Sequence, residues 1–254
     1  MIESGKVSVA VENGIGTITF FHPKSNSLPG SLLAEMARTV TICGENDDIR
    51  VIVLKSEGNR AFCAGASFAE LTAVKDPEGG KEFFMGFARL ILAMKKCPKF
   101  IIARLQGKAV GGGVGVTAAA DYAFAHTSSS AKLSELALGL GPFVVGPAVE
   151  RKVGAGPFAA FTVDTDWRDA AWCERHGLYA GVFETHEALD EATNKLATKL
   201  AGFNPEAMAE LKKVFWEGTE HWDTLLEERA VQSGRLVLSD FTSKAIAAFA
   251  ERIK

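Results

Sequence analysis

Two glycine-rich loops in this chain combine residue types and spacing that suit chemistry at an oxygen atom. The first contains Gly111-Gly112-Gly113, between an apolar strand expected over residues 99–105 and an alanine-rich helix. The second contains Gly65-Ala66 and follows an apolar strand expected over residues 50–55. Backbone N–H groups at the start of a helix lack partners and carry partial positive charge. Together the two loops could direct two N–H donors at one carbonyl oxygen that becomes an anion.

One carboxylate, Glu135, lies where it could exchange a proton. It follows a short strand expected over residues 131–133 and precedes the apolar run 136–138. Burial raises the pKa of a carboxyl group, and a raised pKa suits proton transfer near neutral pH. The alternative is an acid at a helix N-terminus that complements the helix dipole, with Ser134 as the cap. The residues taken alone favour this second interpretation.

Composition indicates an ordinary globular chain. The 254 residues are 47% hydrophobic and 23% charged, which fits one large domain or one domain with a small appendage. The net charge of −3, with scattered basic residues, gives no reason to expect nucleic acid or an anionic membrane as a partner. No segment is apolar enough to cross a bilayer and the N-terminus lacks a secretory signal, so we expect a cytoplasmic protein. Four unpaired cysteines and five widely separated histidines predict reduced, buried thiols and no metal site.

The hydrophobic pattern predicts an α/β protein in which strands and helices alternate through the first half and helices dominate the last third. Glu12-Asn13-Gly14 between two alternating runs indicates a β-hairpin. Strands are expected over 50–55, 99–105, 121–125, 131–133 and 182–183, and helices over about 30–43, 80–96, 187–200, 205–216, 222–238 and 243–253.

The order of several motifs along the chain resembles the crotonase family, also called the enoyl-CoA hydratase/isomerase superfamily. The matching stretches are Phe21–Leu28, Phe62–Ala66, Gly107–Asp121, Ser134–Pro142, Gly177–Val182 and Phe249–Ile253. The resemblance implies a spiral of ββα turns over residues 1–165 that contains an acyl-CoA site. A helical C-terminal region, residues 166–254, would cover the site and mediate assembly into a homotrimer or a dimer of trimers. Four aromatic residues with an exposed pattern would cover a neighbouring subunit: Phe215, Trp216, Trp222 and Phe241.

The same resemblance assigns roles to individual residues. The amides of Ala66 and Gly112 would polarise a thioester carbonyl and stabilise the enolate formed from it, and Glu135 matches the family's second catalytic glutamate. Coenzyme A would be bound as part of the substrate, with no other cofactor and no metal. The residues implied in binding it are Lys24, Asn26, Phe62, Ala64, Gly65, Ala66, Gly111, Gly112, Pro142 and Phe143.

The chain departs from the family pattern at three places. Hydratases carry another glutamate at the position of Gly115, and the family's acidic residue after Ala-Gly-Ala is Ser67 here. The usual Pro-Gly-x-Gly-Gly loop is Pro142-Phe-Val-Val-Gly146, whose bulky residues could fill space near the acyl chain. Hydration benefits from two carboxylates, whereas one base can move a proton between C2 and C4. We therefore expect double-bond isomerisation, with hydration or decarboxylation as alternatives, and a non-catalytic acyl-CoA-binding scaffold as the alternative from another class.

A dinucleotide site is a further alternative. Residues 113–118 fit Gly-x-Gly-x-x-Ala, and Glu135 follows about 20 residues on. The strand expected to begin at Asp121 leaves too little helix for a βαβ crossover, and a related loop lies about 45 residues upstream. The sequence therefore argues against this alternative.

Overall fold

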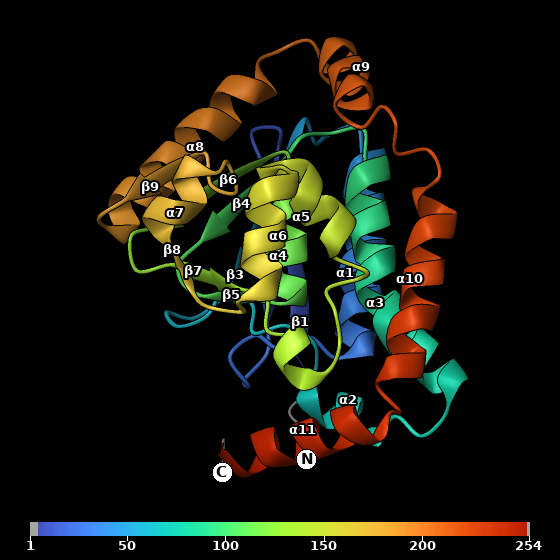
Figure 1. Ribbon diagram of the computed structural model, residues 1–254. Helices are drawn as coiled ribbons and strands as arrows, with labels where there is room; N and C mark the ends of the chain where they lie inside the picture. The colour runs from blue at the N-terminus through green and yellow to red at the C-terminus, as the bar shows by residue number, and fades with distance from the viewer. Residues whose placement is uncertain (1–4, 253–254) are drawn as a thin grey trace.

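The larger of two sheets in the computed structural model, which describes residues 5–252, has six strands in the order β1-β2-β3-β4-β6-β9 (Figure 1). The strands β1 and β2 form an antiparallel hairpin, and all other neighbours are parallel. The predicted hairpin is confirmed: Asn13 and Gly14 both have positive φ, as a type I′ turn requires. The strands are β1 (Lys6–Glu12), β2 (Ile15–Phe21), β3 (Val51–Ser56), β4 (Ile101–Leu105), β6 (Tyr122–His126) and β9 (Gly181–Phe183).

Burial on both faces explains why the central strands read as continuous apolar runs rather than alternating ones. In β3, Ile52 and Leu54 point into the main core, whereas Val51 and Val53 join a second cluster. Helix α8 (His186–Ala201) contributes Leu189 and Ala197 to that second cluster and covers its face of the sheet (Figure 1). The main core lies on the opposite face, under α1 (Gly30–Glu45), α3 (Pro77–Lys96) and α4 (Gly112–Ala119).

Helix α10 (Trp222–Leu236) runs beside α3 on the outside of the molecule (Figure 1). The two helices approach so closely that a Cβ on Gly80 would lie 2.7 Å from the Cα of Gly234. A side chain at either glycine would therefore force the helices apart. The remaining helices are α2 (Phe68–Ala73), the 3₁₀ turn η1 (Leu136–Leu138), α5 (Gly146–Val153), α6 (Ala155–Val163), α7 (Ala170–Arg175), α9 (Pro205–Phe215) and α11 (Asp240–Arg252).

The second, smaller sheet collects the second strands of the ββα turns, together with one strand, Arg168–Asp169, that lies between two helices and runs antiparallel to its neighbour. It contains β5 (Ala109–Val110), β7 (Ser130–Lys132) and β8 (Arg168–Asp169). Parallel bridges Cys63–Ala109 and Leu28–Ala66 extend it by two further segments. Each turn thus runs from the large sheet to the small one and then into a helix, and successive turns stack beside one another. The predicted α/β, crotonase-like spiral is confirmed.

The structure corrects two expectations drawn from the sequence. Trp216 and Trp222 are not exposed: both are buried in the chain's own core and their rings pack edge to face with centroids 5.5 Å apart. Phe215 and Phe241 are exposed, as expected. The segment from 106 to 121 does form a crossover, because β4 and β6 are parallel neighbours joined through α4. The length of this helix therefore does not exclude a dinucleotide site. Burial argues against one, because every residue of α4 is buried within the protein.

Both sheets contain strands from either side of residue 165, since β8 pairs with β7 and β9 pairs with β6. The sequence missed β8, which is two residues long. The division into 1–165 and 166–254 stays a prediction. All four cysteines are free and buried, as predicted. Over residues 5–252, no helix combines the length and the apolar content needed to cross a membrane.

Candidate active site

The candidate site lies where three neighbouring segments of the small sheet end. Ala66 follows the bridge at Cys63, Gly111 follows β5, and Glu135 follows β7. These segments are parallel neighbours, so their carboxyl ends lie at one edge of the sheet. The spiral therefore brings together residues that are about 45 and 70 positions apart in the sequence from Ala66.

Hydrogen bonding to Leu28 fixes the direction of the Ala66 amide. Leu28 N–H donates to the carbonyl of Gly65 at 2.8 Å, and its carbonyl accepts from the Ser67 amide at 3.1 Å. In a parallel bridge of this kind, the N–H of the residue between the two partners points away from the neighbouring strand. Within residues 5–252, no protein acceptor takes the Ala66 N–H. Gly65 makes the turn possible with φ +88°.

The second amide is that of Gly112, the first residue of α4. Gly111 precedes it with φ +52° and ψ −114°, a conformation open to glycine. The N–H of a first helical residue has no acceptor inside its own helix, and no acceptor for Gly112 is found elsewhere in the described chain. A Cβ built on Gly65 would lie 3.9 Å from the Gly112 nitrogen, so the two loops meet. The Phe87 ring packs directly on Gly112 and leaves no room for a side chain there.

The Glu135 carboxylate lies against Gly111. A Cβ built on Gly111 would be 3.1 Å from Oε1 of Glu135, while Oε2 is buried and has no hydrogen-bond partner among the described residues. Burial raises the pKa of Glu135 to about 7, and the backbone amides of Glu135 and Ser134 oppose this rise only in part. Its side chain makes no capping hydrogen bond to η1, which is three residues long. The geometry therefore disfavours a simple helix-capping acid and resembles a carboxyl group prepared to exchange a proton.

The raised pKa predicts a pH-dependent stability. Between the ordinary value of 4.5 and about 7, the folded chain holds a proton on Glu135 that the unfolded chain has released. The free energy of unfolding should therefore fall as pH rises through this window, by at most about 3 kcal/mol from this group. Denaturant unfolding of the wild type and Glu135→Gln at pH 4.5 and 8 measures it. The variant should be more stable relative to the wild type at pH 8 than at pH 4.5. An equal difference in the free energy of unfolding between the two proteins at both pH values would contradict the raised pKa.

Gly115, one turn along α4 from Gly112, faces a filled space. A Cβ built on it would lie 2.6 Å from Cγ1 of Val145 and 3.4 Å from Cδ1 of Ile91. Both of these side chains are buried in the main core. The Val145 side chain thus occupies the place that a side chain at 115 would need. A glutamate at position 115 would therefore not fit beside Val145 unless the surrounding core shifted.

The comparisons with known proteins agree with this architecture. The sequence profile of the family described as "Enoyl-CoA hydratase/isomerase" matches residues 10–254. The chain belongs to the enoyl-CoA hydratase/isomerase family. A "Short-chain-enoyl-CoA hydratase" of Clostridium acetobutylicum is 27% identical over 261 residues, covering 100% of this chain and 97% of that protein. A "Trans-2-decenoyl-[acyl-carrier-protein] isomerase" of Streptococcus mutans is 21% identical over 252 residues, covering 95% and 94%. The crystal structure of an enoyl-CoA hydratase from Mycobacterium avium superposes with a TM-score of 0.87 at 26% identity, covering 97% and 96%.

Within this hydratase/isomerase fold, the two polar residues predicted to bind coenzyme A differ in their surroundings. Asn26 is buried, and its side chain joins its own loop to the loop between β3 and α2. Its Oδ1 accepts from the His22 amide at 2.8 Å, and its Nδ2 donates to the carbonyls of Glu57 and Ala61, each at 2.9 Å. Lys24 is exposed on the same loop. The contacts of Asn26 show a structural role, whereas the Lys24 ammonium is accessible to a phosphate.

The other predicted binding residues contribute mainly backbone. Phe62 is fully buried, and its ring packs edge to face on Phe20 with centroids 5.4 Å apart. Its side chain therefore holds the loop in place, while the half-buried Ala64 lies at the surface. Pro142 is buried and Phe143 is half-buried in the loop that leads to α5. Val144 and Val145 of that loop join the main core.

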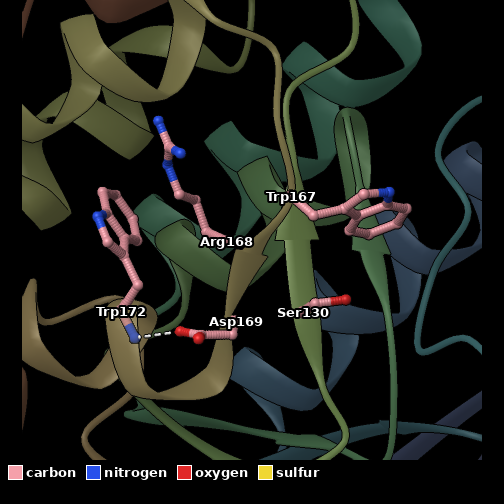
Figure 2. Close-up of a pocket in the computed structure, with 5 residues that line it drawn as sticks. All are labelled: Ser130, Trp167, Arg168, Asp169 and Trp172. Atoms are coloured by element: carbon pink, nitrogen blue, oxygen red, sulfur yellow. Dashed lines mark hydrogen bonds between the residues drawn. The ribbon is translucent and has the colours of Figure 1, made fainter.

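A cavity at β8 is separate from these residues. It is lined by Ser130, Trp167, Arg168, Asp169 and Trp172. Figure 2 shows Arg168 and Trp172 on one side of the strands and Trp167 and Ser130 on the other, so the side chains do not converge on one point. Asp169 accepts a hydrogen bond from the Trp172 amide at 2.7 Å and caps α7. Over residues 5–252, no cluster of three His, Cys, Asp or Glu side chains could hold a metal ion.

Proposed function

We propose that the protein binds an acyl-CoA thioester with its carbonyl oxygen between the amides of Ala66 and Gly112. Both N–H groups are held by backbone that other hydrogen bonds fix, so they need no reorganisation when charge develops on the oxygen. Such preorganised donors stabilise an enolate, and losing one typically costs about 2.7–4 kcal/mol of barrier.

Glu135 is the base in this proposal. It removes a proton from C2 of a 3-enoyl thioester, the electron pair moves onto the carbonyl oxygen as a dienolate, and the same carboxyl group returns the proton at C4 to give the 2-enoyl thioester. The observation that carries the proposal is the Glu135 carboxylate, buried beside Gly111 with a pKa of about 7. A group of this pKa is close to half ionised at neutral pH and can both accept and donate.

Isomerisation is favoured over hydration because Val145 fills the space beside Gly115. A second carboxylate that would hold and activate water has no room at this position. Glu70 does not replace it directly, because its Oε2 accepts a hydrogen bond from the Gly30 amide at 2.8 Å. Relatives named for hydration and for isomerisation both occur, so the family alone does not decide between the two reactions.

The coenzyme A moiety would lie along the outer surface of the two loops. Lys24 would meet a phosphate, and the carbonyls around Ala64 would meet the adenine. The thioester enters as the substrate, and the proposed chemistry needs no other cofactor. Assembly into a trimer or a dimer of trimers is also proposed, with the apolar side chains exposed on α9 available for contact: Leu211, Val214 and Phe215.

The wild type alone provides the test. It should convert 3-hexenoyl-CoA to 2-hexenoyl-CoA faster than it hydrates 2-hexenoyl-CoA, with products resolved by chromatography and mass. Faster hydration would overturn the isomerase assignment but would not contradict the proposed enolate-stabilising site. A parallel reaction with branched dicarboxylic acyl-CoAs tests decarboxylation. Tight binding of all these thioesters without turnover would favour a non-catalytic acyl-CoA-binding protein.

A further inference from the structure

The backbone turn that carries Glu135 is closed by a glycine. The amides of Leu138 and Leu140 both donate to the Glu135 carbonyl, at 3.0 and 2.9 Å. Gly139 ends η1 in the left-handed region with φ +80°, and its amide donates to the Leu136 carbonyl at 3.0 Å. Oε2 of Glu135 has no hydrogen-bond partner in the described chain, so no hydrogen bond holds this oxygen in place. Its position depends on how firmly this turn is held.

Helix α11 holds the turn from outside through Thr242. This residue is fully buried, and its Oγ1 donates to the Gly139 carbonyl at 3.2 Å. The hydroxyl of Ser239 donates to the same Oγ1 at 3.0 Å, so the Thr242 hydroxyl both accepts and donates. The contact is tight, since a Cβ on Gly139 would lie 2.6 Å from Oγ1 of Thr242.

The same helix reaches the loop of the first amide. The Phe249 ring packs against Phe68 with centroids 5.4 Å apart, and Phe68 begins α2 two residues after Ala66. Between these two contacts, Ile246 joins Leu140 in a small apolar cluster separate from the main core. Helix α11 therefore lies across both the Ala66 loop and the Glu135 turn, near the lower end of the molecule in Figure 1.

We propose that Thr242 is a positioning residue for Glu135: its hydrogen bond to the Gly139 carbonyl fixes the turn that points the carboxylate at Gly111 and the neighbouring amide. This inference rests on the proposed role of Glu135. Thr242 does not touch the substrate and acts through the backbone from Gly139 to Glu135. When the hydrogen bond is lost, the turn loosens, the carboxylate moves from its productive position and water reaches it.

The test compares Thr242→Val, which keeps the shape and removes the hydroxyl, with Thr242→Ser, which keeps the hydroxyl. Ser243→Ala, at an exposed position on the same helix, is the matched control. The readouts are exchange of the C2 hydrogens of butyryl-CoA in D₂O and turnover of 3-hexenoyl-CoA across pH 5–9. Thr242→Val should slow both by about tenfold or more, since misplacement of a catalytic group by about 1 Å costs up to about 100-fold. KM should change less than about twofold.

The pH profile separates positioning from simple loss of folded protein. In Thr242→Val the midpoint of the pH–rate curve should move down by about half a pH unit or more, because a carboxylate reached by water titrates closer to its ordinary value. Thr242→Ser should restore both rate and midpoint. An unchanged rate, or a lower rate with an unchanged midpoint, would overturn the proposal.

Two further variants keep the outcome decisive. If Thr242→Val does not fold, Ser239→Ala takes its place, because it removes the hydroxyl that holds the Thr242 side chain. The midpoint of its pH–rate curve should move down as well. An unchanged midpoint would overturn the proposal. Glu135→Gln is measured beside them. Wild-type exchange in Glu135→Gln would overturn the proposed function itself, whereas inactive Glu135→Gln with unaltered Thr242→Val would overturn the positioning role alone.

Discussion

Replacing Glu135 by glutamine is expected to slow exchange of the C2 hydrogens of butyryl-CoA by about 100-fold or more. A positioned general base typically contributes about 10²–10⁴-fold. The amide has nearly the same shape as the carboxyl group but does not accept the proton. Binding of coenzyme A should persist, because the proposed contacts lie in the Lys24 loop and the loop of residues 62–66. Exchange followed by mass spectrometry and binding followed by calorimetry together measure both quantities.

Glu70→Gln is the matched control for this prediction. Glu70 is another carboxylate close in sequence to Ala66, but Oε2 already accepts the Gly30 amide hydrogen. We expect its exchange rate to stay within a few-fold of the wild type. If Glu70→Gln lost as much exchange as Glu135→Gln, Glu70 would share the proton transfer. Unchanged exchange in Glu135→Gln would remove Glu135 from the mechanism.

The same substitution should stabilise the fold at alkaline pH. The buried carboxylate, with its pKa raised to about 7, is only partly compensated when it is charged, because Oε2 has no hydrogen-bond partner among the described residues. A neutral amide avoids most of that cost. Loss of turnover together with gain of stability is what a group under functional constraint should show. A residue kept for folding would show losses in both.

The sequence predicted the secondary structure well where local pattern decides it. Helical periodicity predicted α1, α3 and α8 to α11, and apolar runs predicted β3, β4 and β6. Helices buried along one stripe and strands buried on both faces each have a characteristic order of apolar residues. The glycines gave both loops, since Gly65 and Gly111 adopt positive φ. The strand β8 could not be predicted in this way, because two residues are too few to show a hydrophobic periodicity.

Contacts between distant segments were beyond sequence reasoning. Val145 packs against Gly115 from 30 positions away, and Phe87 packs on Gly112, yet each reads locally as an ordinary apolar residue. Asn26 is a residue of the family motif, and only the structure shows its side chain tying loops together. Trp216 and Trp222 fit an exposed helical pattern but bury each other. In these cases tertiary packing overrides what the local pattern indicates.

The second large effect is expected from a pair of substitutions at Gly115 and Val145. Gly115→Glu alone should destabilise the fold by about 1–3 kcal/mol, because its Cβ would meet Val145 at 2.6 Å and the core must shift. Adding Val145→Gly removes the obstructing side chain. The double variant should recover part of the lost stability and place a carboxylate on α4, one turn beyond the Gly112 amide. Denaturant unfolding of both variants checks this first step.

If the missing carboxylate is the reason that hydration is disfavoured, the folded double variant should hydrate 2-hexenoyl-CoA about tenfold or more faster than the wild type. This is less than the about 10²–10⁴-fold of a well-positioned acid or base, because an introduced carboxylate is not held in place by its surroundings. Gly115→Gln with Val145→Gly is the matched control, since it has the same size and no acid. Equal hydration by both double variants would show that added space, rather than the carboxylate, admits water. Efficient hydration by the wild type would show that Glu135 suffices, and the role assigned to Val145 in excluding the second carboxylate would then be wrong.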